Sequence, residues 1–281
     1  MNEHFDDKTV IITGGSEGVG AAAARRFAAE GANLVLVARS RKNLEAVAEE
    51  LRGQARVLIV PMDVTDFDAC QNLFKKAMFE FHAVHVLVNN AGYHSRGFAE
   101  NIAIEDLGRM IDVNLRAPIV LSRMAIPYIR ESGGGAIVNV ASLAGQVPVT
   151  GAAAYSASKF GLRAFTFALG AELAGSGIKL AAVSPGPIDT GFIMSDIDAV
   201  ANINFSQPIS TAAEVADEIV KLCLNGKRER SIPRLSGFLA YLGYLFPALH
   251  RLLQPLLDAK GARVKRRLKA EIRTRSETGG R

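Results

Sequence analysis

Short apolar runs rich in β-branched residues alternate along this chain with longer stretches of helical periodicity. A short run without polar alternation is typical of a strand that is buried on both faces, as in a parallel sheet. Repetition of strand and helix predicts βαβ units wound to both sides of the sheet centre. We therefore predict an α/β fold, a doubly wound parallel sheet of the Rossmann-like type, as a single domain with a C-terminal helical extension.

The boundaries of the expected elements follow from where each pattern begins and ends. The expected strands are Thr9–Thr13, Asn33–Ala38, Arg56–Pro61, Val84–Asn89, Gly135–Ala141 and Ile178–Ser184. The expected helices are Gly20–Glu30, Arg41–Arg52, Asp66–Phe81, Ile104–Ser132, Ala152–Ala174 and Thr211–Leu224. Residues 190–210 lack clear periodicity after the last central strand, so we expect a lid over a substrate site there.

Composition restricts the class of protein. The 281 residues are 49% apolar and 22% charged, which is globular composition and sufficient for one large core. Cys70 and Cys223 are too few and too far apart for a disulfide framework, and no Cys/His cluster has metal-ligand spacing. The acidic N-terminus lacks the basic start and apolar stretch of a signal peptide. We expect a metal-free, cytoplasmic protein in a reducing compartment.

A glycine-rich turn, Thr13-Gly-Gly-Ser-Glu-Gly-Val-Gly20, follows the first strand and opens a helix. Its candidate cofactor residues are Gly14, Ser16, Gly18 and Gly20. Gly14 and Gly18 let the backbone turn and approach a pyrophosphate, Gly20 allows close helix packing, and the helix N-terminus supplies N–H donors. Because the spacing differs from the usual dinucleotide fingerprint, an ordinary glycine-rich connection is the alternative.

Arg39 stands after the second strand, where an NAD-binding strand would end in Asp or Glu to hold the ribose 2′-hydroxyl. A guanidinium at this place attracts a 2′-phosphate and binds it bidentately. The sequence therefore favours NADP over NAD. Glu17 in the glycine turn weakens this interpretation through its negative charge, and a solvated loop cation is the alternative.

Two more strand ends carry polar residues. Asp63, after the third strand, is placed to accept from an adenine amino group, but an Asx-type turn or a helix cap before Asp66 is an equally ordinary interpretation. Asn89 and Asn90 close the fourth strand, where side-chain amides can hold neighbouring strands together. Gly92, two residues further on, leaves room for a cofactor, so we expect Asn90 at the cofactor site.

Tyr155 and Lys159 stand one helical turn apart, thirteen residues after Ser142. A free phenol has a pKa of about 10, too high for easy proton exchange near neutrality, and a cation one turn away favours the phenolate. We expect Lys159 to make Tyr155 a usable acid or base. Each residue alone has an ordinary explanation as a packed aromatic, a turn cap or a solvated cation. Together with the glycine turn, they indicate a nicotinamide-dependent oxidoreductase.

In their order along the chain, these motifs resemble those of the short-chain dehydrogenase/reductase family, of the type with Thr-Gly-x-x-x-Gly-x-Gly and Tyr-x-x-x-Lys. The resemblance covers roughly Lys8 to Leu224. It implies an enzyme that interconverts a carbonyl and a secondary alcohol, expected as a homodimer or homotetramer. The implied catalytic residues are Asn114, Ser142, Tyr155 and Lys159.

The resemblance also implies a division of roles. In reduction, hydride passes from the nicotinamide to the carbonyl carbon while Tyr155 protonates the oxygen and Ser142 hydrogen-bonds it. Lys159 is expected to hold the nicotinamide ribose as well, so it and Tyr155 are also cofactor contacts. Asn114 is expected to support a water relay that resupplies the proton.

The segment Pro185-Gly-Pro-Ile-Asp-Thr190 belongs to the same pattern. Ile188 and Thr190 are expected to contact the nicotinamide carboxamide, and a simple rigid turn is the alternative. His94 follows the Asn-Asn-Ala-Gly segment and is a candidate for the substrate mouth, with a surface histidine as the alternative.

The C-terminal tail departs from the family pattern, whose shorter chains end soon after a strand near Ser231–Pro233. Residues 231–281 contain eleven Lys/Arg and three Asp/Glu, a local charge of +8 in a chain of +5 overall. The uncharged run 235–250 is shorter than the roughly 18 to 20 residues that span a bilayer. Both a helix on an anionic membrane surface and a hairpin covering the core or a subunit interface fit the pattern. No nucleic-acid recognition motif accompanies the basic residues.

These patterns lead to a set of functional expectations. We expect a dinucleotide-binding catalytic domain over 1–233 and an apolar, then basic, helical tail over 234–281. Contact of residues 235–269 with a membrane surface, at the cytoplasmic face, stays an open alternative. The expected substrate is a lipid-like ketone, since the tail is similar to that of family members acting on 3-keto sphingoid bases. A soluble 3-oxoacyl-thioester or general ketone reductase is the alternative. A dinucleotide-binding scaffold without turnover is the alternative class.

Overall fold

A computed structural model of the chain describes residues 4–191, 197–198 and 200–278. It contains a seven-stranded parallel sheet in the order β3-β2-β1-β4-β5-β6-β7. The strands are β1 (Thr9–Thr13), β2 (Asn33–Ala38), β3 (Val57–Pro61), β4 (Val86–Asn89), β5 (Gly135–Val140), β6 (Ile178–Pro185) and β7 (Glu229–Ile232). The strand order reverses between β1 and β4, and in doubly wound sheets the ligand crevice lies at the carboxyl edge beside this point. The predicted fold class is confirmed.

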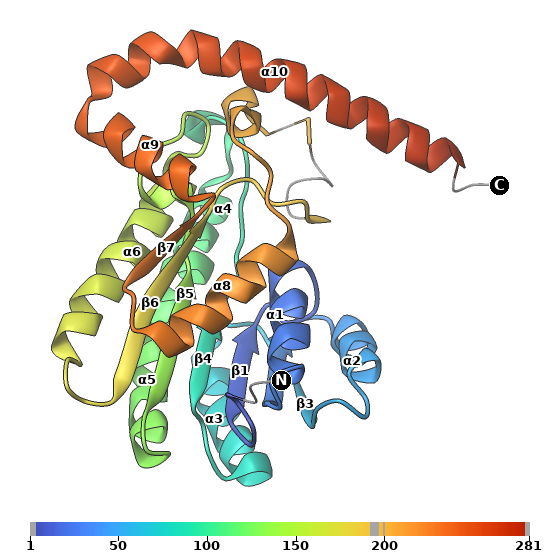
Figure 1. Cartoon of the computed structure of the whole chain (residues 1–281), viewed down its shortest axis with the longest axis vertical. Helices are drawn as coiled ribbons and strands as arrows, with labels where there is room; N and C mark the ends of the chain where they lie inside the picture. Colours follow the sequence, from blue (N-terminus) through green and yellow to red (C-terminus); the bar gives the residue numbers. More distant parts are fainter. Residues whose placement is uncertain (1–3, 192–196, 199, 279–281) are drawn as a thin grey trace.

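Helices cover both faces of the sheet and enclose two apolar cores. One layer contains α1 (Gly18–Ala28), α2 (Arg41–Glu50) and α8 (Ala212–Asn225), and the other α3 (Phe67–Phe81), α5 (Ala117–Glu131) and α6 (Ala153–Glu172). Figure 1 shows α1 and α8 next to each other across the near face. Val10 and Ile12 of β1 belong to one core and Ile11 to the other, because successive strand residues point to opposite faces.

The sequence located the central strands better than the last one. The bounds of β1 and β2 agree with the prediction, since both are uninterrupted apolar runs between polar residues. The strand β7, Glu-Arg-Ser-Ile, has one apolar residue and pairs only with β6 at the sheet edge. Its pattern carries no strand signal, and only the family resemblance placed a strand nearby.

The helix expected over 104–132 is divided in the structure. It consists of α4 (Ile104–Ile111), a π turn η2 (Asp112–Arg116) and α5. The prediction of one regular helix was wrong at the π turn, which adds a residue to the helical path and re-aims the side chains within it. Asn114 lies in this turn, so the irregularity coincides with a predicted site residue.

Short helices and a C-terminal pair complete the fold. The short ones are η1 (Ala99–Asn101), η3 (Leu143–Gly145) and η4 (Asn202–Ser206). After β7, α9 (Arg234–Leu245) leads into α10 (Pro247–Thr278), which crosses the top of the molecule in Figure 1 and packs on η4. Within the expected lid 190–210, residues 192–196 and 199 lie outside the described ranges. No helix in the part of the chain that the structure covers is long and apolar enough to cross a bilayer.

Candidate active site

The glycine turn connects β1 to α1 at the carboxyl edge. Gly14 and Gly18 have φ values of +64° and +53°, a left-handed conformation that favours glycine. A Cβ on Gly20 would lie 2.0 Å from the carbonyl oxygen of Gly14, so no side chain fits there. Glu17 at the N-cap makes no side-chain capping hydrogen bond to the first turn of α1. A bare backbone at a helix N-terminus fits the pyrophosphate of a dinucleotide.

Thr13 and Asn90 tie this turn to the end of β4. Thr13 Oγ1 accepts from the backbone N–H of Asn90 at 2.9 Å and of Ala91 at 3.0 Å. Asn90 Nδ2 donates to the carbonyl oxygens of Thr13 at 2.9 Å and Gly14 at 3.2 Å. Asn90 thus shapes the glycine turn directly. Thr13 is part of the same arrangement, although the sequence marked it only as the first residue of the motif.

Buried amides connect the sheet to the helix that carries Tyr155. Asn89 Nδ2 donates to Asn139 Oδ1 at 2.8 Å, which joins β4 to β5. Asn139 Nδ2 donates to Thr166 Oγ1 on α6, also at 2.8 Å. The prediction that an amide at the end of β4 holds neighbouring strands together is confirmed for Asn89.

Arg39 and Asp63 lie just after the neighbouring strands β2 and β3. Asp63 Oδ1 accepts from Thr65 N at 2.9 Å, so the Asx-type turn is present, and its Oδ2 lies 3.7 Å from an Arg109 guanidinium nitrogen. Burial opposes ionisation of Asp63, but hydrogen bonds from Thr65 and the charges of Arg109 and Arg39 outweigh it and lower the pKa of Asp63. The Arg39 side chain is exposed at the rim.

Ser142, Tyr155 and Lys159 converge where β5 ends and α6 begins. The Tyr155 side chain is hydrogen-bonded to that of Ser142. Lys159 Nζ donates to the carbonyl oxygen of Val140 at 2.8 Å and lies 5.8 Å from the centroid of the Tyr155 ring. Ser142 Oγ accepts from Ala144 N at 3.1 Å, which fixes its rotamer. A hydroxyl, a phenol and an ammonium therefore lie together at the carboxyl edge of the sheet.

The protonation of this group differs from the expectation. Burial raises the pKa of Tyr155, and the Ser142 hydrogen bond and the Arg96 charge oppose this only in part. Burial lowers the pKa of Lys159 to about 8. The prediction that Lys159 would bring the pKa of Tyr155 down was wrong in its net direction, because burial disfavours the charged form of both groups.

Asn114 is fully buried in the π turn and joins two parts of the site. Its Oδ1 accepts from Tyr93 N at 2.8 Å, and its Nδ2 donates to Tyr93 O at 2.7 Å and to Ser158 Oγ at 3.3 Å. Ser158 immediately precedes Lys159 on α6. Asn114 therefore holds the loop after β4 against the helix of the catalytic candidates, and its role in a water relay stays a prediction.

His94 and Arg96 bring this loop to Tyr155. The His94 ring stacks on the Tyr155 ring with centroids 4.1 Å apart and an interplanar angle of 13°. Burial, together with the charges of Arg96 and Lys159, lowers the pKa of His94 to about 4, so its imidazole is neutral near pH 7. Sequence reasoning proposed His94 only for the substrate mouth and missed Arg96, because neither belongs to a spaced motif.

The segment after β6 closes the other side of the glycine turn. Ile188 pairs with Ser210 in a single β-bridge, and Thr190 N donates to the carbonyl oxygen of Ile188 at 2.9 Å. A Cβ placed on Gly18 would lie 3.5 Å from Thr190 Cγ2. Ile188 and Thr190 thus lie beside the glycine turn, where a bound dinucleotide would pass.

A carboxylate at the sheet edge holds α6, the helix of the catalytic candidates. Glu229 of β7 accepts from Arg163 on α6 through both oxygens, at 2.7 and 2.9 Å, and from Gln146 and Ser184 at 2.8 Å each. Burial works against ionisation of Glu229, but these donors hold its pKa below the ordinary value. The sequence did not predict this network, because its acceptor belongs to the strand that carried no signal.

Known proteins with similar sequences point to the same chemistry. Residues 8–201 match the family model described as short chain dehydrogenase. Sulfoacetaldehyde reductase 2 of Chromohalobacter salexigens is 38% identical over 187 residues, which are 66% of this chain and 74% of that protein. Ketoacyl reductase HetN of Nostoc sp. is 34% identical over 224 residues, 79% and 77% of the two chains. An uncharacterised oxidoreductase of Staphylococcus saprophyticus is 33% identical over 230 residues, 80% and 93%. The resemblance seen in the motifs is confirmed, and the chain belongs to the short-chain dehydrogenase/reductase family as an NAD(P)-dependent oxidoreductase of the carbonyl-reductase type.

Proposed function

We propose that this protein is an NADP-dependent reductase that converts a lipid-like ketone, of the 3-keto sphingoid base type, into a secondary alcohol. The observation that carries the proposal is the convergence of Ser142, Tyr155 and Lys159 at the carboxyl edge beside the glycine turn. A proton donor, a second hydrogen-bond donor and a cation are thereby within reach of a single carbonyl group.

The residues of the crevice fit a dinucleotide, which supplies the hydride when bound. Arg39 would hold the 2′-phosphate of NADP, and Asp63 the adenine amino group. Ile188 and Thr190 would face the carboxamide, and Lys159 with Tyr155 the nicotinamide ribose. The pyrophosphate would lie along the turn formed by Gly14, Ser16, Gly18 and Gly20, with Asn90 behind it.

The raised pKa of Tyr155 suits a proton donor. Its hydroxyl stays protonated near neutral pH, so it can protonate the carbonyl oxygen as negative charge develops there. Ser142 donates a hydrogen bond to the same oxygen. Lys159, mostly protonated below pH 8, stabilises the phenolate that remains. Asn114 would then support the water relay that returns a proton to Tyr155. This order of protonation states favours reduction over oxidation near neutrality.

A small buried apolar cluster in the segment after β6 is what supports a hydrophobic substrate. The described part of the segment after Thr190 packs Ile197, Val200 and Phe205 against apolar residues of α10. A 3-oxoacyl thioester is the second candidate, because a relative of 34% identity is a ketoacyl reductase. A small soluble ketone is the third, since another relative is a sulfoacetaldehyde reductase.

We also infer contact with a membrane surface through residues 235–269 and a homo-oligomer formed through α4 to α6. Exposed Ile104 and Ile111 on α4 support the oligomer, because apolar side chains there would be covered by a second copy. The basic and apolar tail supports the membrane contact.

The test is NADPH oxidation with a panel of long-chain 3-keto lipids, 3-oxoacyl thioesters and small ketones. We expect turnover of the lipid ketones and at least a hundredfold loss, roughly the contribution of a general acid, in Tyr155→Phe. Equal turnover by Tyr155→Phe would refute the assigned acid. Turnover confined to thioesters or small ketones would select one of the alternatives.

A further inference from the structure

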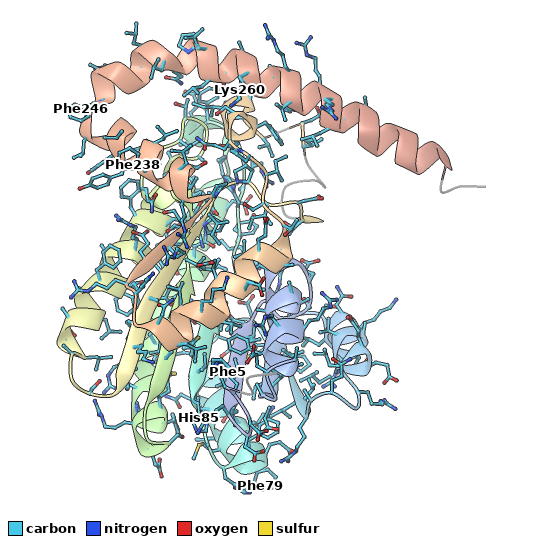
Figure 2. The ribbon with its side chains drawn as sticks, viewed as in Figure 1. Phe5, Phe79, His85, Phe238, Phe246 and Lys260 are labelled. Atoms are coloured by element: carbon cyan, nitrogen blue, oxygen red, sulfur yellow. The ribbon has the colours of Figure 1, made fainter. Side chains whose placement is uncertain are left out.

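Helices α9 and α10 meet in an elbow whose outer side is unusually apolar. The exposed large apolar side chains of this elbow surface are Leu235, Phe238, Leu239, Tyr241, Tyr244, Leu245, Phe246, Leu252, Leu253 and Leu256. Phe238 is 60% exposed and Phe246 56%. Figure 2 shows both phenylalanines on the outside of the elbow, away from the sheet. An apolar surface of this extent marks an interaction site.

A basic surface continues the elbow surface along α10. Lys260, Arg263 and Arg266 are exposed, and Figure 2 marks Lys260 on the helix beyond the elbow. Residues three or four apart share one helix face, so exposed Leu252 and Leu256 lead directly into Lys260 and Arg263. The outer side of α10 thus changes from leucine to cation along one stripe.

The inner side of α10 is already occupied by the segment that follows Thr190. A Cβ on Gly261 would lie 1.8 Å from the carbonyl oxygen of Asn202, so the backbones of α10 and η4 are in direct contact. Lys265 Nζ donates to the carbonyl oxygens of Asp198 at 2.9 Å and Val200 at 2.7 Å. The stripe of leucines and cations therefore faces away from the protein, and the orientation of α10 about its axis is fixed.

The charge of the tail discriminates between the possible occupants of the elbow surface. Residues 231–281 carry a local charge of +8 from eleven Lys/Arg and three Asp/Glu. A second copy docked through the same surface would bring two such segments together, and their repulsion opposes pairing. An anionic lipid surface attracts the cations and accepts the apolar side chains at its interface. Tyr241 and Tyr244 also suit that interface, since tyrosine has an apolar ring and a polar end.

We propose that the elbow surface docks on an anionic lipid bilayer, with the apolar side chains of α9 and early α10 in the interface and Lys260, Arg263 and Arg266 on the phosphates. The docking proposal rests on the membrane contact inferred above, and it adds which surface of the protein makes that contact and which lipid charge attracts it. It depends on no other part of the proposed function. Because the opposite side of α10 packs against the described residues of the expected lid, 197–198 and 200–206, docking also places that part of the lid about one helix diameter from the lipid.

Vesicle sedimentation of the full chain tests the proposal. One set of vesicles contains phosphatidylcholine alone, and the other contains phosphatidylcholine and phosphatidylglycerol in equal amounts. We expect the parent protein to sediment with the anionic vesicles only and to be released by salt, because salt screens the attraction. Phe238→Ser combined with Phe246→Ser is expected to weaken partitioning by about tenfold or more, given the free energy of burying each aromatic side chain.

Two phenylalanines on α3 provide the matched control. Phe67 is 49% and Phe79 84% exposed, and Figure 2 places Phe79 at the opposite end of the molecule. Phe67→Ser combined with Phe79→Ser is expected to bind like the parent. Equal binding by the elbow variant, or a parent that ignores anionic vesicles, would overturn the proposal. An elbow variant that dissociates into smaller oligomers in lipid-free sedimentation velocity would assign the surface to a second copy instead.

The same proteins separate docking from catalysis. The elbow variant is expected to reduce a soluble ketone at the parent's rate without vesicles, and Tyr155→Phe to bind vesicles like the parent. A parent that binds vesicles but turns over no ketone would refute the proposed reductase and leave the docking surface standing. A parent that turns over ketones but does not bind vesicles would refute the docking surface and leave the proposed reductase standing.

Discussion

The imidazole of His94 lies parallel to the phenol of Tyr155, with ring centroids 4.1 Å apart and planes 13° from parallel. Because the His94 pKa is about 4, this contact is a stack of two neutral rings across the working pH range. The stack restricts the orientation of the phenol, which is the proposed acid. Asn114 holds the loop that carries His94 through two hydrogen bonds to Tyr93. Hydrogen bonds and ring stacking therefore connect the π turn, through this loop, to the phenol.

His94→Ala should lower kcat by about fivefold, which corresponds to an aromatic pair of roughly 1 kcal/mol. His94→Phe keeps the stack and should restore most of the rate, which a role in proton transfer would not allow. Steady-state kinetics with both variants distinguishes the two. His82→Asn, at an exposed left-handed helix end, is the control.

Arg96→Met should raise the pKa of Tyr155 further, because the guanidinium charge favours the phenolate. Oxidation of the alcohol product needs the phenolate, so the acidic limb of its pH–rate profile should move to higher pH. Profiles of kcat/KM for oxidation in parent and variant measure the shift. An unmoved limb, or one displaced to lower pH, would contradict the assigned influence of Arg96.

Lys159→Met should abolish turnover and yet stabilise the fold at pH 7, by at most about 3 kcal/mol. The pKa of Lys159 falls from 10.5 to about 8 in the folded protein, so the folded state binds fewer protons than the unfolded state between these values. The destabilising effect of burying the Lys159 ammonium is fully present below pH 8 and fades as the pH rises toward 10.5. Urea denaturation at pH 7 and pH 10 measures the difference. A variant less stable than the parent at pH 7 would contradict the prediction.

Glu229→Gln should destabilise the protein by about 2–3 kcal/mol, since it leaves the mostly buried Arg163 without its carboxylate partner. The pKa of Glu229 is lowered, so its contribution is present above the ordinary carboxyl pKa and is lost as pH falls through the folded value. Parent and variant should therefore converge in acid. Glu50→Gln breaks the exposed Arg25–Glu50 pair and serves as the control, with a change under about 1 kcal/mol. Equal losses for the two substitutions would reject the special role of Glu229.

Arg39→Asp should weaken NADPH relative to NADH by about tenfold or more, because a charge-assisted hydrogen bond is replaced by charge repulsion. Dissociation constants from cofactor fluorescence give the ratio without any substrate. An unchanged ratio would show that Arg39 does not select the cofactor.

Features set by local sequence were predictable. The strands β1 and β2 were located because a parallel strand buried on both faces is an unbroken apolar run, and the glycine turn because its backbone leaves no room for side chains at Gly20. Tyr155 and Lys159 were found because a helix fixes the distance between residues four apart.

Features that depend on the path of distant segments were not predictable. The raised pKa of Tyr155 follows from burial, which the sequence does not reveal. The stack on His94 depends on how a loop is folded back by Asn114, and the π turn at Asn114 has no sequence signal. The Glu229 network needed an edge strand whose residues are mainly polar.

The close approach of Gly261 to Asn202 fixes which side of α10 faces the rest of the protein. An α-helix turns by about 100° per residue, so a single insertion between Pro247 and Gly261 would rotate the residues before the insertion by that angle relative to Gly261, which stays against Asn202. Leucines and cations would then point at different neighbours even though the composition of the segment was unchanged. An insertion of seven residues, about two whole turns, would preserve the orientation of the leucines that a single insertion loses.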